Sequence, residues 1–186
     1  MGKVMWKKEE GLGSQFPYHI YLIGFMGSGK TAVSTQLAKL CSMEAIEMDR
    51  MISEREGMGI PEIFDRYGEG YFRSLETKLL EELQGKGHAV VSCGGGTPMR
   101  KENVERMRQN GKIVLLSAEP ETIYARVKDS HDRPLLEGNM NIPYISGLME
   151  QRRERYEKAA DLILHTDGKG IKEICMEITQ RLHKIG

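Results

Sequence analysis

The sequence predicts an α/β fold in which helices cover both faces of a parallel sheet. Along the chain of 186 residues, short apolar runs alternate with segments of helical periodicity. The runs are apolar at successive positions, which is typical of parallel strands that are buried on both faces. Strands that alternate with helices over this length indicate right-handed crossovers and a layered sandwich.

Five strands and six helix starts can be assigned from the pattern. The predicted strands are His19–Ile23, Ala45–Met48, Ala89–Cys93, Lys112–Leu116 and Asp161–Leu164. Helical patterns begin near Lys30, Pro61, Pro98, Glu119, Ile142 and Lys169. Pro61 and Pro98 suit the first turn of a helix, where the missing N–H would have no partner.

The domain organisation is expected to be simple. Residues 1–17 lack apolar periodicity and are expected to form a poorly ordered leader. Residues 18–186 are expected to form a single domain. Within it, the polar segment of about 128–142, broken by Pro134 and Gly138, predicts a long, mobile loop of the kind that often carries function.

Composition excludes several classes of protein. The 27 basic and 27 acidic residues give a formal net charge of zero, whereas nucleic-acid binding favours a basic excess. No apolar stretch approaches the length of a membrane span, and the amino-terminal residues lack the apolar region of a signal peptide. Three cysteines without metal-like spacing indicate reduced thiols, so a cytoplasmic protein is expected.

A phosphate-binding motif follows the first predicted strand. Residues 24–31, GFMGSGKT, match the pattern G-x-x-x-x-G-K-[ST]. In this motif backbone N–H groups surround a phosphate, the lysine (Lys30) reaches the β- and γ-phosphates of ATP, and the hydroxyl (Thr31) binds Mg²⁺. The alternative is a glycine-rich turn without a ligand. The residues expected at the phosphates are Gly27, Ser28, Gly29, Lys30, Thr31 and Ala32.

Two acidic residues, Glu47 and Asp49, lie at the predicted end of the second strand. In an extended chain, positions two apart face the same side, and the carboxyl edge of a parallel sheet is where such folds bind ligands. One carboxylate would hold the acceptor hydroxyl while the other supports the metal through water. Alternatively, both residues cap the following helix, with Asp49 as the N-cap.

Two arginines are candidates for binding an acidic acceptor. Arg73 and Glu76 are three apart on a helix, so they form either a surface ion pair or an oriented carboxylate clamp. Arg152 falls on the inward stripe that also contains Ile145, Met149 and Tyr156, whereas Arg153 and Arg155 should face water. A buried arginine needs an anion, which is either an internal carboxylate or a ligand.

Two further segments are candidates for contacts with the reacting groups. Residues 94–96, Gly-Gly-Gly, directly follow the third strand and would allow close approach of the backbone to a hydroxylated ring. Arg133 lies in the long loop, where it is either solvated or positioned to close over the phosphates and stabilise the charge of the transferring group.

Taken together, these segments resemble the shikimate kinase family from about residue 19 to residue 184. The landmarks occur in the family's order: GFMGSGKT, the acidic pair, GIPEIFDRYGEGYFRSLE, SCGGGTP, HDRPLL, and an arginine four residues before the tyrosine of RRERYEKAAD. The phosphate-binding motif alone is shared with other small kinases, but GExxFRxxE, GGG and RPLL together are far more specific.

The resemblance implies a three-layer α/β/α P-loop kinase with a five-stranded parallel sheet and a mobile lid. It implies ATP-dependent phosphorylation of the shikimate 3-hydroxyl in aromatic amino-acid synthesis, with Mg²⁺ as cofactor. ATP and shikimate would be the small-molecule partners, with neither nucleic acid nor membrane involved. A monomer is expected, because no heptad or large apolar stripe indicates a second subunit.

The resemblance also implies roles for individual residues. Asp49 would hold the 3-hydroxyl and act as base, and the arginines of the acceptor site would bind the shikimate carboxylate. The implied acceptor-binding set is Asp49, Arg73, Gly95, Gly96 and Arg152. The implied catalytic set is Asp49, Lys30 and Arg133, with Arg133 on ATP from the lid, and Arg126 would lie near the adenine.

The chain departs from the family's usual pattern at three positions. Glu47 stands where Asp is common, Ala32 replaces a frequent second hydroxyl residue, and Glu154 replaces a proline that usually follows the carboxylate-binding arginine. Two other functions compete with shikimate phosphorylation. One is a related kinase that acts on gluconate or a nucleoside monophosphate, and the other is a nucleotide-binding module without catalysis.

Overall fold

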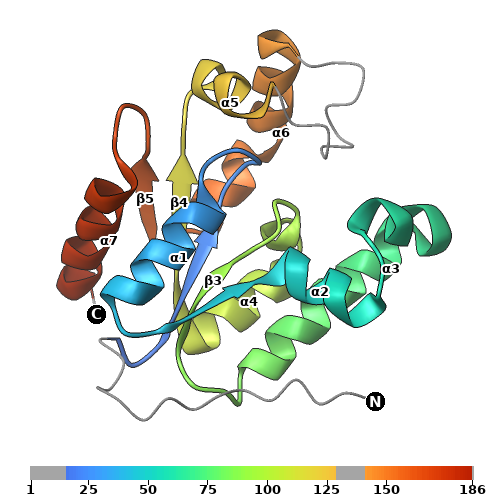
Figure 1. Ribbon diagram of the computed structural model, residues 1–186, viewed down its shortest axis with the longest axis horizontal. Helices are drawn as coiled ribbons and strands as arrows, with labels where there is room; N and C mark the ends of the chain where they lie inside the picture. Colours follow the sequence, from blue (N-terminus) through green and yellow to red (C-terminus); the bar gives the residue numbers. More distant parts are fainter. Residues whose placement is uncertain (1–15, 129–140, 186) are drawn as a thin grey trace.

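The computed structural model describes residues 16–128 and 141–185 and confirms the predicted α/β architecture (Figure 1). Five strands form one parallel sheet in the order β2-β3-β1-β4-β5. They are β1 (His19–Ile23), β2 (Glu44–Glu47), β3 (Ala89–Ser92), β4 (Gly111–Ser117) and β5 (Leu162–His165). The helices in the described ranges are α1 (Lys30–Leu40), α2 (Met48–Glu56), α3 (Ile60–Leu83), η1 (Thr97–Met99, a 3₁₀ turn), α4 (Lys101–Asn110), α5 (Pro120–Val127), α6 (Ile142–Ala159) and α7 (Ile171–Ile185).

Each face of the sheet has its own hydrophobic core, as the continuous apolar runs predict. Successive side chains of a strand point to opposite faces. Ile20 and Leu22 of β1 pack with α1 and α7, whereas Tyr21 and Ile23 pack with the helices from α2 to α6 (Figure 1). The sheet is therefore the middle layer of three.

The packed part of the chain includes Phe16. This side chain is buried in the hydrophobic core between the sheet and helices α1 and α7. Its ring centroid lies 4.8 Å from that of His183. Phe16 belongs to the segment that the sequence analysis assigns to the leader; residues 1–15 lie outside the described residues. Among the helices of the described ranges, none is both long and apolar enough to cross a membrane.

Helix α2 begins directly after β2, which the sequence pattern did not predict. Its first residue, Met48, and Ile52 one turn later are buried, but two apolar positions are too few to show a helical period. Asp49 consequently lies in the first turn of α2 and not in extended chain, so the face-sharing argument for Glu47 and Asp49 was wrong. The alternative was also wrong, because the N-cap of α2 is Glu47 and its side chain makes no capping hydrogen bond.

Helix α3 changes direction at Gly68. This residue has φ 80° and ψ 165°, a conformation that is accessible almost only to glycine. The change separates residues 60–67 from residues 69–83. The second half carries Arg73 and Glu76, so the kink decides how both side chains approach the sheet.

The strand order brings the candidate segments to one edge. Strand β1 lies between β3 and β4, and β2 flanks β3. The phosphate-binding loop after β1, the three glycines after β3 and the acidic pair after β2 are therefore neighbours at the carboxyl edge of the sheet. This edge, where the order of strands switches direction, is the usual ligand site of open α/β sheets.

The kink can be tested with two glycines of α3 that differ in backbone conformation. A methyl group at Gly68 or at Gly70 would meet no atom within 4 Å, but only Gly68 has a positive φ. We expect Gly68→Ala to lower the free energy of unfolding by about 1–3 kcal/mol. Gly70→Ala is expected to leave it unchanged or raise it by up to about 1 kcal/mol. Urea unfolding measures both, and equal effects would show that the kink is not constrained by its backbone conformation.

Candidate active site

The phosphate-binding loop leads from β1 into the amino terminus of α1. Gly27 and Gly29 have positive φ angles of 75° and 98°, which allow the tight turn of the loop. The Nζ of Lys30 donates to the carbonyl oxygens of Gly24 and Phe25 at 2.9 and 3.0 Å, so the ammonium group lies across the loop. The first turn of α1 contains no acidic residue. Free N–H groups at a helix amino terminus and a nearby ammonium group make a site for phosphate.

A cavity of about 380 Å³ joins this loop to the acidic pair. The hydroxyl of Thr31 donates to Oε1 of Glu47 at 2.8 Å. Asp49 faces the same cavity although it comes from the helix. The cavity is lined by Met26, Gly27, Gly29, Lys30, Thr31, Ala32, Glu47, Asp49, Ser92, Cys93, Gly95 and Arg126. The structure thus brings together most residues of the predicted phosphate and metal sites.

Asp49 is the carboxylate best suited to accept a proton. Its Oδ1 is buried and has no hydrogen-bond partner in the described part of the chain. Burial is the main cause that raises the pKa of Asp49 to about 6, and the negative charge of Glu76 adds to the rise. A carboxylate that lines a cavity, has a pKa near neutrality and has an oxygen without a hydrogen-bond partner is a candidate general base.

Arg73 and Glu76 form a buried pair, which excludes a solvated surface bridge. Glu76 has no solvent exposure, and its Oε2 accepts from Nη1 of Arg73 at 2.8 Å. Glu69 accepts from Nε and Nη2 of the same guanidinium at 3.1 and 2.8 Å. Of the five N–H donors of Arg73, three bind these carboxylates, and within residues 16–128 and 141–185 the other two, on Nη1 and Nη2, have no acceptor. Two N–H groups on neighbouring nitrogens can bind a carboxylate.

The three glycines after β3 have different spatial roles. A methyl group at Gly94 would lie 2.7 Å from Oδ1 of Asp49 and 2.7 Å from Oε1 of Glu76, and one at Gly96 would lie 2.2 Å from Nη1 of Arg73. Gly94 and Gly96 therefore make room for the chain's own charged side chains. At Gly95 the same methyl group would meet its neighbours at ordinary contact distance, so only this glycine leaves space for a ligand.

Arg152 lies beside Gly95, on the inward stripe of α6, one turn before Tyr156. A methyl group on Gly95 would be 3.6 Å from Nη1 of Arg152 and 3.7 Å from the hydroxyl of Tyr156. Tyr156 donates to the Gly95 carbonyl oxygen at 2.7 Å, and the Arg152 guanidinium lies 5.8 Å from the centre of the Phe25 ring. The predicted stripe is confirmed, since Ile145 and Tyr156 are buried.

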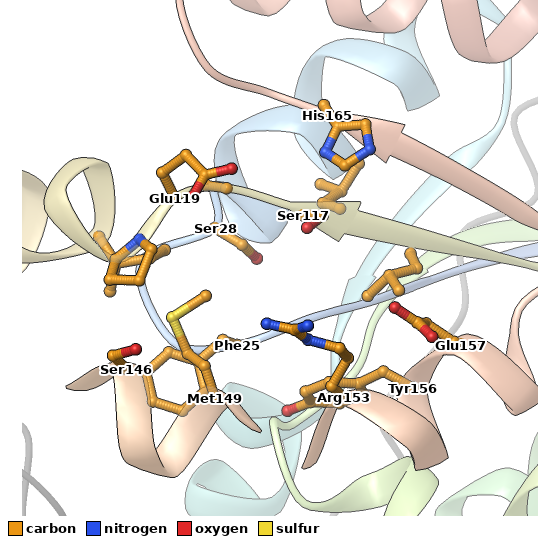
Figure 2. A pocket seen from close by; sticks show the side chains of 15 residues that line it. Phe25, Ser28, Ser117, Glu119, Ser146, Met149, Arg153, Tyr156, Glu157 and His165 are labelled. Carbon is orange, nitrogen blue, oxygen red and sulfur yellow. The ribbon is translucent and has the colours of Figure 1, made fainter. Parts of the chain in front are cut away.

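Arg153 faces a different cavity, which the sequence analysis did not predict. This cavity of about 300 Å³ lies between the phosphate-binding loop, the end of β4 and α6, and Figure 2 shows Arg153 extending into it from α6. Phe25 and Ser28 also line it, whereas Arg152 does not. Arg153 is largely exposed and pairs with Glu150 at 2.6 Å. Of the two neighbouring arginines, Arg153 therefore lines this cavity, whereas Arg152 lies beside Gly95.

Two further predicted residues lie at or beyond the border of the described site. Nη1 of Arg126 donates to the Gly27 carbonyl oxygen at 3.2 Å and to the Thr166 hydroxyl at 3.3 Å, so Arg126 connects the phosphate-binding loop to the end of β5. Arg133 lies outside the described residues, as does most of the predicted lid.

The oxygen ligands at the phosphate loop fit a magnesium ion. Within residues 16–128 and 141–185 no three His, Cys, Asp or Glu side chains cluster as a metal site. Mg²⁺ bound with a nucleotide needs no such cluster, because phosphate oxygens and waters supply most of its ligands. The Thr31 hydroxyl, the Glu47 carboxylate in contact with it and the unpartnered Oδ1 of Asp49 are all hard oxygen donors.

Sequence reasoning missed Thr97 and Asn103. Both are fully buried, and the Thr97 hydroxyl donates to Oε1 of Glu76 at 2.5 Å. Neither residue stands out in the sequence, because a hydrogen bond between η1 and the middle of α3 joins positions 21 apart.

Comparison with known proteins was made on the sequence and on the fold. A family model described as shikimate kinase matches residues 26–183. The shikimate kinase of Persephonella marina is 39% identical over 88% of this chain and 98% of its own length. That of Deinococcus radiodurans is 37% identical over 88% of this chain and 82% of its own length.

Solved structures agree with this result. A shikimate kinase from Acinetobacter baumannii in complex with shikimate has a TM-score of 0.86 at 31% identity, covering 91% of this chain and 95% of that one. A gluconokinase from Sinorhizobium meliloti has a TM-score of 0.57 at 18% identity, covering 92% of this chain and 94% of that one, and shares the fold alone.

The raised pKa of Asp49 predicts that the ionised carboxylate lowers the free energy of unfolding by an amount that depends on pH. Because the pKa in the folded state, about 6, exceeds the ordinary value of 3.8, the folded state binds the proton more tightly than the unfolded chain does. Stability should therefore fall as pH rises from about 4 to about 6, and the whole cost should be present above that range. We expect Asp49→Asn, without ligands, to raise the free energy of unfolding by about 1–3 kcal/mol at pH 7.5 and by almost nothing at about pH 4.

The control for this measurement is Asp65→Asn, which changes an exposed carboxylate on α3. It is expected to alter stability by less than about 0.5 kcal/mol at either pH. Denaturant unfolding at the two pH values compares the variants with the unchanged protein. A loss of stability in Asp49→Asn at pH 7.5 would mean that the carboxylate is held by favourable interactions.

Proposed function

The chain belongs to the shikimate kinase family, and from this premise we propose how its residues carry out the family's reaction. The reaction transfers the γ-phosphoryl group of ATP to the 3-hydroxyl of shikimate, giving shikimate 3-phosphate and ADP, in aromatic amino-acid biosynthesis. The single observation that carries the proposed roles is the free Oδ1 of Asp49. This oxygen is buried against Gly94, and Asp49 lines one cavity with Lys30 and Gly95.

Asp49 is the proposed general base. As the acceptor oxygen forms its bond to the γ-phosphorus, the hydroxyl proton moves to the carboxylate of Asp49, and the bond between the γ-phosphorus and the bridging oxygen breaks. The charge that develops on the departing β-phosphate is stabilised by Lys30 and by backbone N–H groups of the loop. The loop residues proposed to hold the phosphates are Gly27, Ser28, Gly29, Lys30, Thr31 and Ala32.

The acceptor is proposed to bind by its carboxylate. The guanidinium of Arg73 lies against Gly96, that of Arg152 lies beside Gly95, and both are proposed to bind the carboxylate. Gly96 contributes by letting Arg73 lie against the backbone. Positioning the acceptor in this way aligns its hydroxyl with Asp49 and supplies much of the catalytic effect in phosphoryl transfer.

The proposal also names residues that would bind Mg²⁺ and the adenine of ATP. The Thr31 hydroxyl would bind Mg²⁺ directly and Glu47 would bind it through water, and the ion would neutralise charge on the phosphate oxygens. Arg126 is proposed to lie against the adenine, since it contacts Thr166 at the end of β5. Arg133, outside the described residues, remains the proposed lid arginine.

The proposal treats residues 18–186 as one catalytic domain that works as a cytoplasmic monomer, with residues 1–17 as a leader. Cys41, Cys93 and Cys175 are free and buried, which suits a reducing compartment. ATP and shikimate are the proposed partners, and neither nucleic acid nor a membrane is part of the proposal.

A coupled ADP-release assay with ATP and Mg²⁺ tests the function. Shikimate, gluconate and a panel of nucleoside monophosphates are offered as acceptors, and turnover is expected on shikimate alone. Asp49→Asn is the inactive control, since it should lose turnover while still binding ATP. Turnover on another acceptor would overturn the substrate assignment, and ATP binding without any turnover would favour a non-catalytic module.

The neighbouring arginines give a matched test of acceptor binding. Arg152→Ala should raise the KM for shikimate about tenfold or more, because hydrogen bonds to charged groups contribute about 1.5–3 kcal/mol each. Arg153→Ala should change it less than about twofold, because this side chain is largely exposed and faces the other cavity. Steady-state kinetics with varied shikimate at saturating ATP measures both, and the reverse pattern would exchange the two assignments.

A further inference from the structure

A buried chain of hydrogen bonds leads from α4 to the acceptor arginine. Asn103 donates from Nδ2 to the Thr97 carbonyl oxygen at 3.0 Å, and its Oδ1 accepts from the Thr77 hydroxyl at 2.8 Å. Thr97 donates from its hydroxyl to Glu76, and Glu76 accepts from Arg73. The chain of hydrogen bonds thus begins on α4 and ends on Arg73, which is proposed to bind the acceptor.

The directions of these hydrogen bonds are determined by chemistry. An ionised carboxylate only accepts, so the single hydroxyl proton of Thr97 must point at Glu76. The Thr97 carbonyl oxygen can only accept, so the Asn103 amide nitrogen donates to it. The Asn103 Oδ1 then accepts from the Thr77 hydroxyl, which also lies 3.1 Å from the Arg73 carbonyl oxygen. Asn103 therefore determines where the first residue of η1 lies, and through it the position of the Thr97 hydroxyl.

Burial makes this arrangement energetically important for Arg73. Glu76, Thr97 and Asn103 have no solvent exposure, so water cannot replace a lost donor. In the described part of the chain, Glu76 receives hydrogen bonds from Arg73 and Thr97, one on each carboxylate oxygen. Without the Thr97 hydroxyl, one oxygen of a buried charge would lose its donor, and the carboxylate would have to move or rotate to recover one.

A shift of Glu76 would reach the acceptor through Arg73. The guanidinium lies so close to Gly96 that no Cβ would fit between them, and a ring–cation contact of 5.4 Å places it beside Phe72. These contacts fix the plane of the Arg73 guanidinium, and Glu76 and Glu69 accept hydrogen bonds from two of its sides. The remaining two N–H groups point toward the acceptor only while both carboxylates stay in place.

We propose that Thr97, held by Asn103, is a positioning residue that acts through Glu76 to aim Arg73 at the carboxylate of the acceptor. This inference rests on the proposed function, because it requires an acceptor with a carboxylate. It assigns to η1 and α4 a part in substrate selection, although neither residue touches the substrate.

The test removes one hydroxyl without changing the shape of the side chain. Thr97→Val should raise the KM for shikimate about tenfold, the lower end of the value of a hydrogen bond to a charged group. The KM for ATP should change by less than about twofold, because the phosphate-binding loop makes no part of the chain of hydrogen bonds. Thr97→Ser restores the hydroxyl and should restore the KM for shikimate.

A substrate analogue separates positioning from a structural role. In the hydroxymethyl analogue of shikimate a primary alcohol replaces the carboxylate, so Arg73 has no anion to which it can donate hydrogen bonds. We expect Thr97→Val and the unchanged protein to have the same kcat/KM with this analogue. A merely structural role would lower kcat/KM equally for both acceptors, and that result would overturn the proposal.

Tyr21→Phe is the matched control. It also removes one buried hydroxyl, which donates to Oδ1 of Asn110 at 2.8 Å at the far end of α4. It should lower stability while leaving the KM for shikimate unchanged, so a KM rise equal to that of Thr97→Val would count against positioning.

The remaining outcomes are also decisive. An unchanged shikimate KM in Thr97→Val, or a Thr97→Ser variant as impaired as Thr97→Val, would overturn the proposal. If Thr97→Val does not fold, Thr77→Val removes the donor to Asn103, and a smaller rise in KM confined to shikimate supports the proposal while no rise overturns it. Absence of turnover by the unchanged protein would instead overturn the proposed function, so the two failures are distinguishable.

Discussion

Glu76 brings a negative charge to a position without solvent exposure, and the acceptor side of the site is arranged around that charge. Arg73 and Thr97 supply a hydrogen bond to each of its oxygens, and Gly94 lets Asp49 approach it closely. The same charge contributes to the raised pKa of Asp49. One desolvated carboxylate thus holds the arginine that is proposed to bind the acceptor and helps raise the pKa of the proposed base.

The parallel sheet supplies the frame that this arrangement needs. Because the carboxyl ends of β1, β2 and β3 lie side by side, the phosphate-binding loop, the acidic pair and the glycine turn meet without long connections. The three glycines after β3 allow charged side chains to pack closely against the backbone at this edge. Two of them accommodate the chain's own charged groups and one leaves room for the acceptor, so a sequence of three identical residues has more than one physical role.

Function is divided between helices on the same face of the sheet. Helix α3 carries the proposed carboxylate clamp and α2 carries the proposed base. Helix α6 carries Arg152, which contacts Phe25, and Arg153, which lines a cavity together with Phe25. The kink at Gly68 and the start of α2 directly after β2 are both set by the backbone conformation of one or two residues. Each of them changes the direction of a side chain that faces the acceptor.

The sequence by itself determined the succession of the five strands and of the helices other than α2, the phosphate-binding loop, the inward stripe of α6 and the family, because these depend on local periodicity and on contiguous motifs. Only the tertiary structure decided that Asp49 lies in a helix, that Glu76 is fully buried and that Thr97 and Asn103 support it. The physical reason is that burial and hydrogen bonding between α3, η1 and α4 join residues far apart in the chain. The energies of these hydrogen bonds depend on how completely the whole fold excludes water from them, and a local pattern of residues does not predict that.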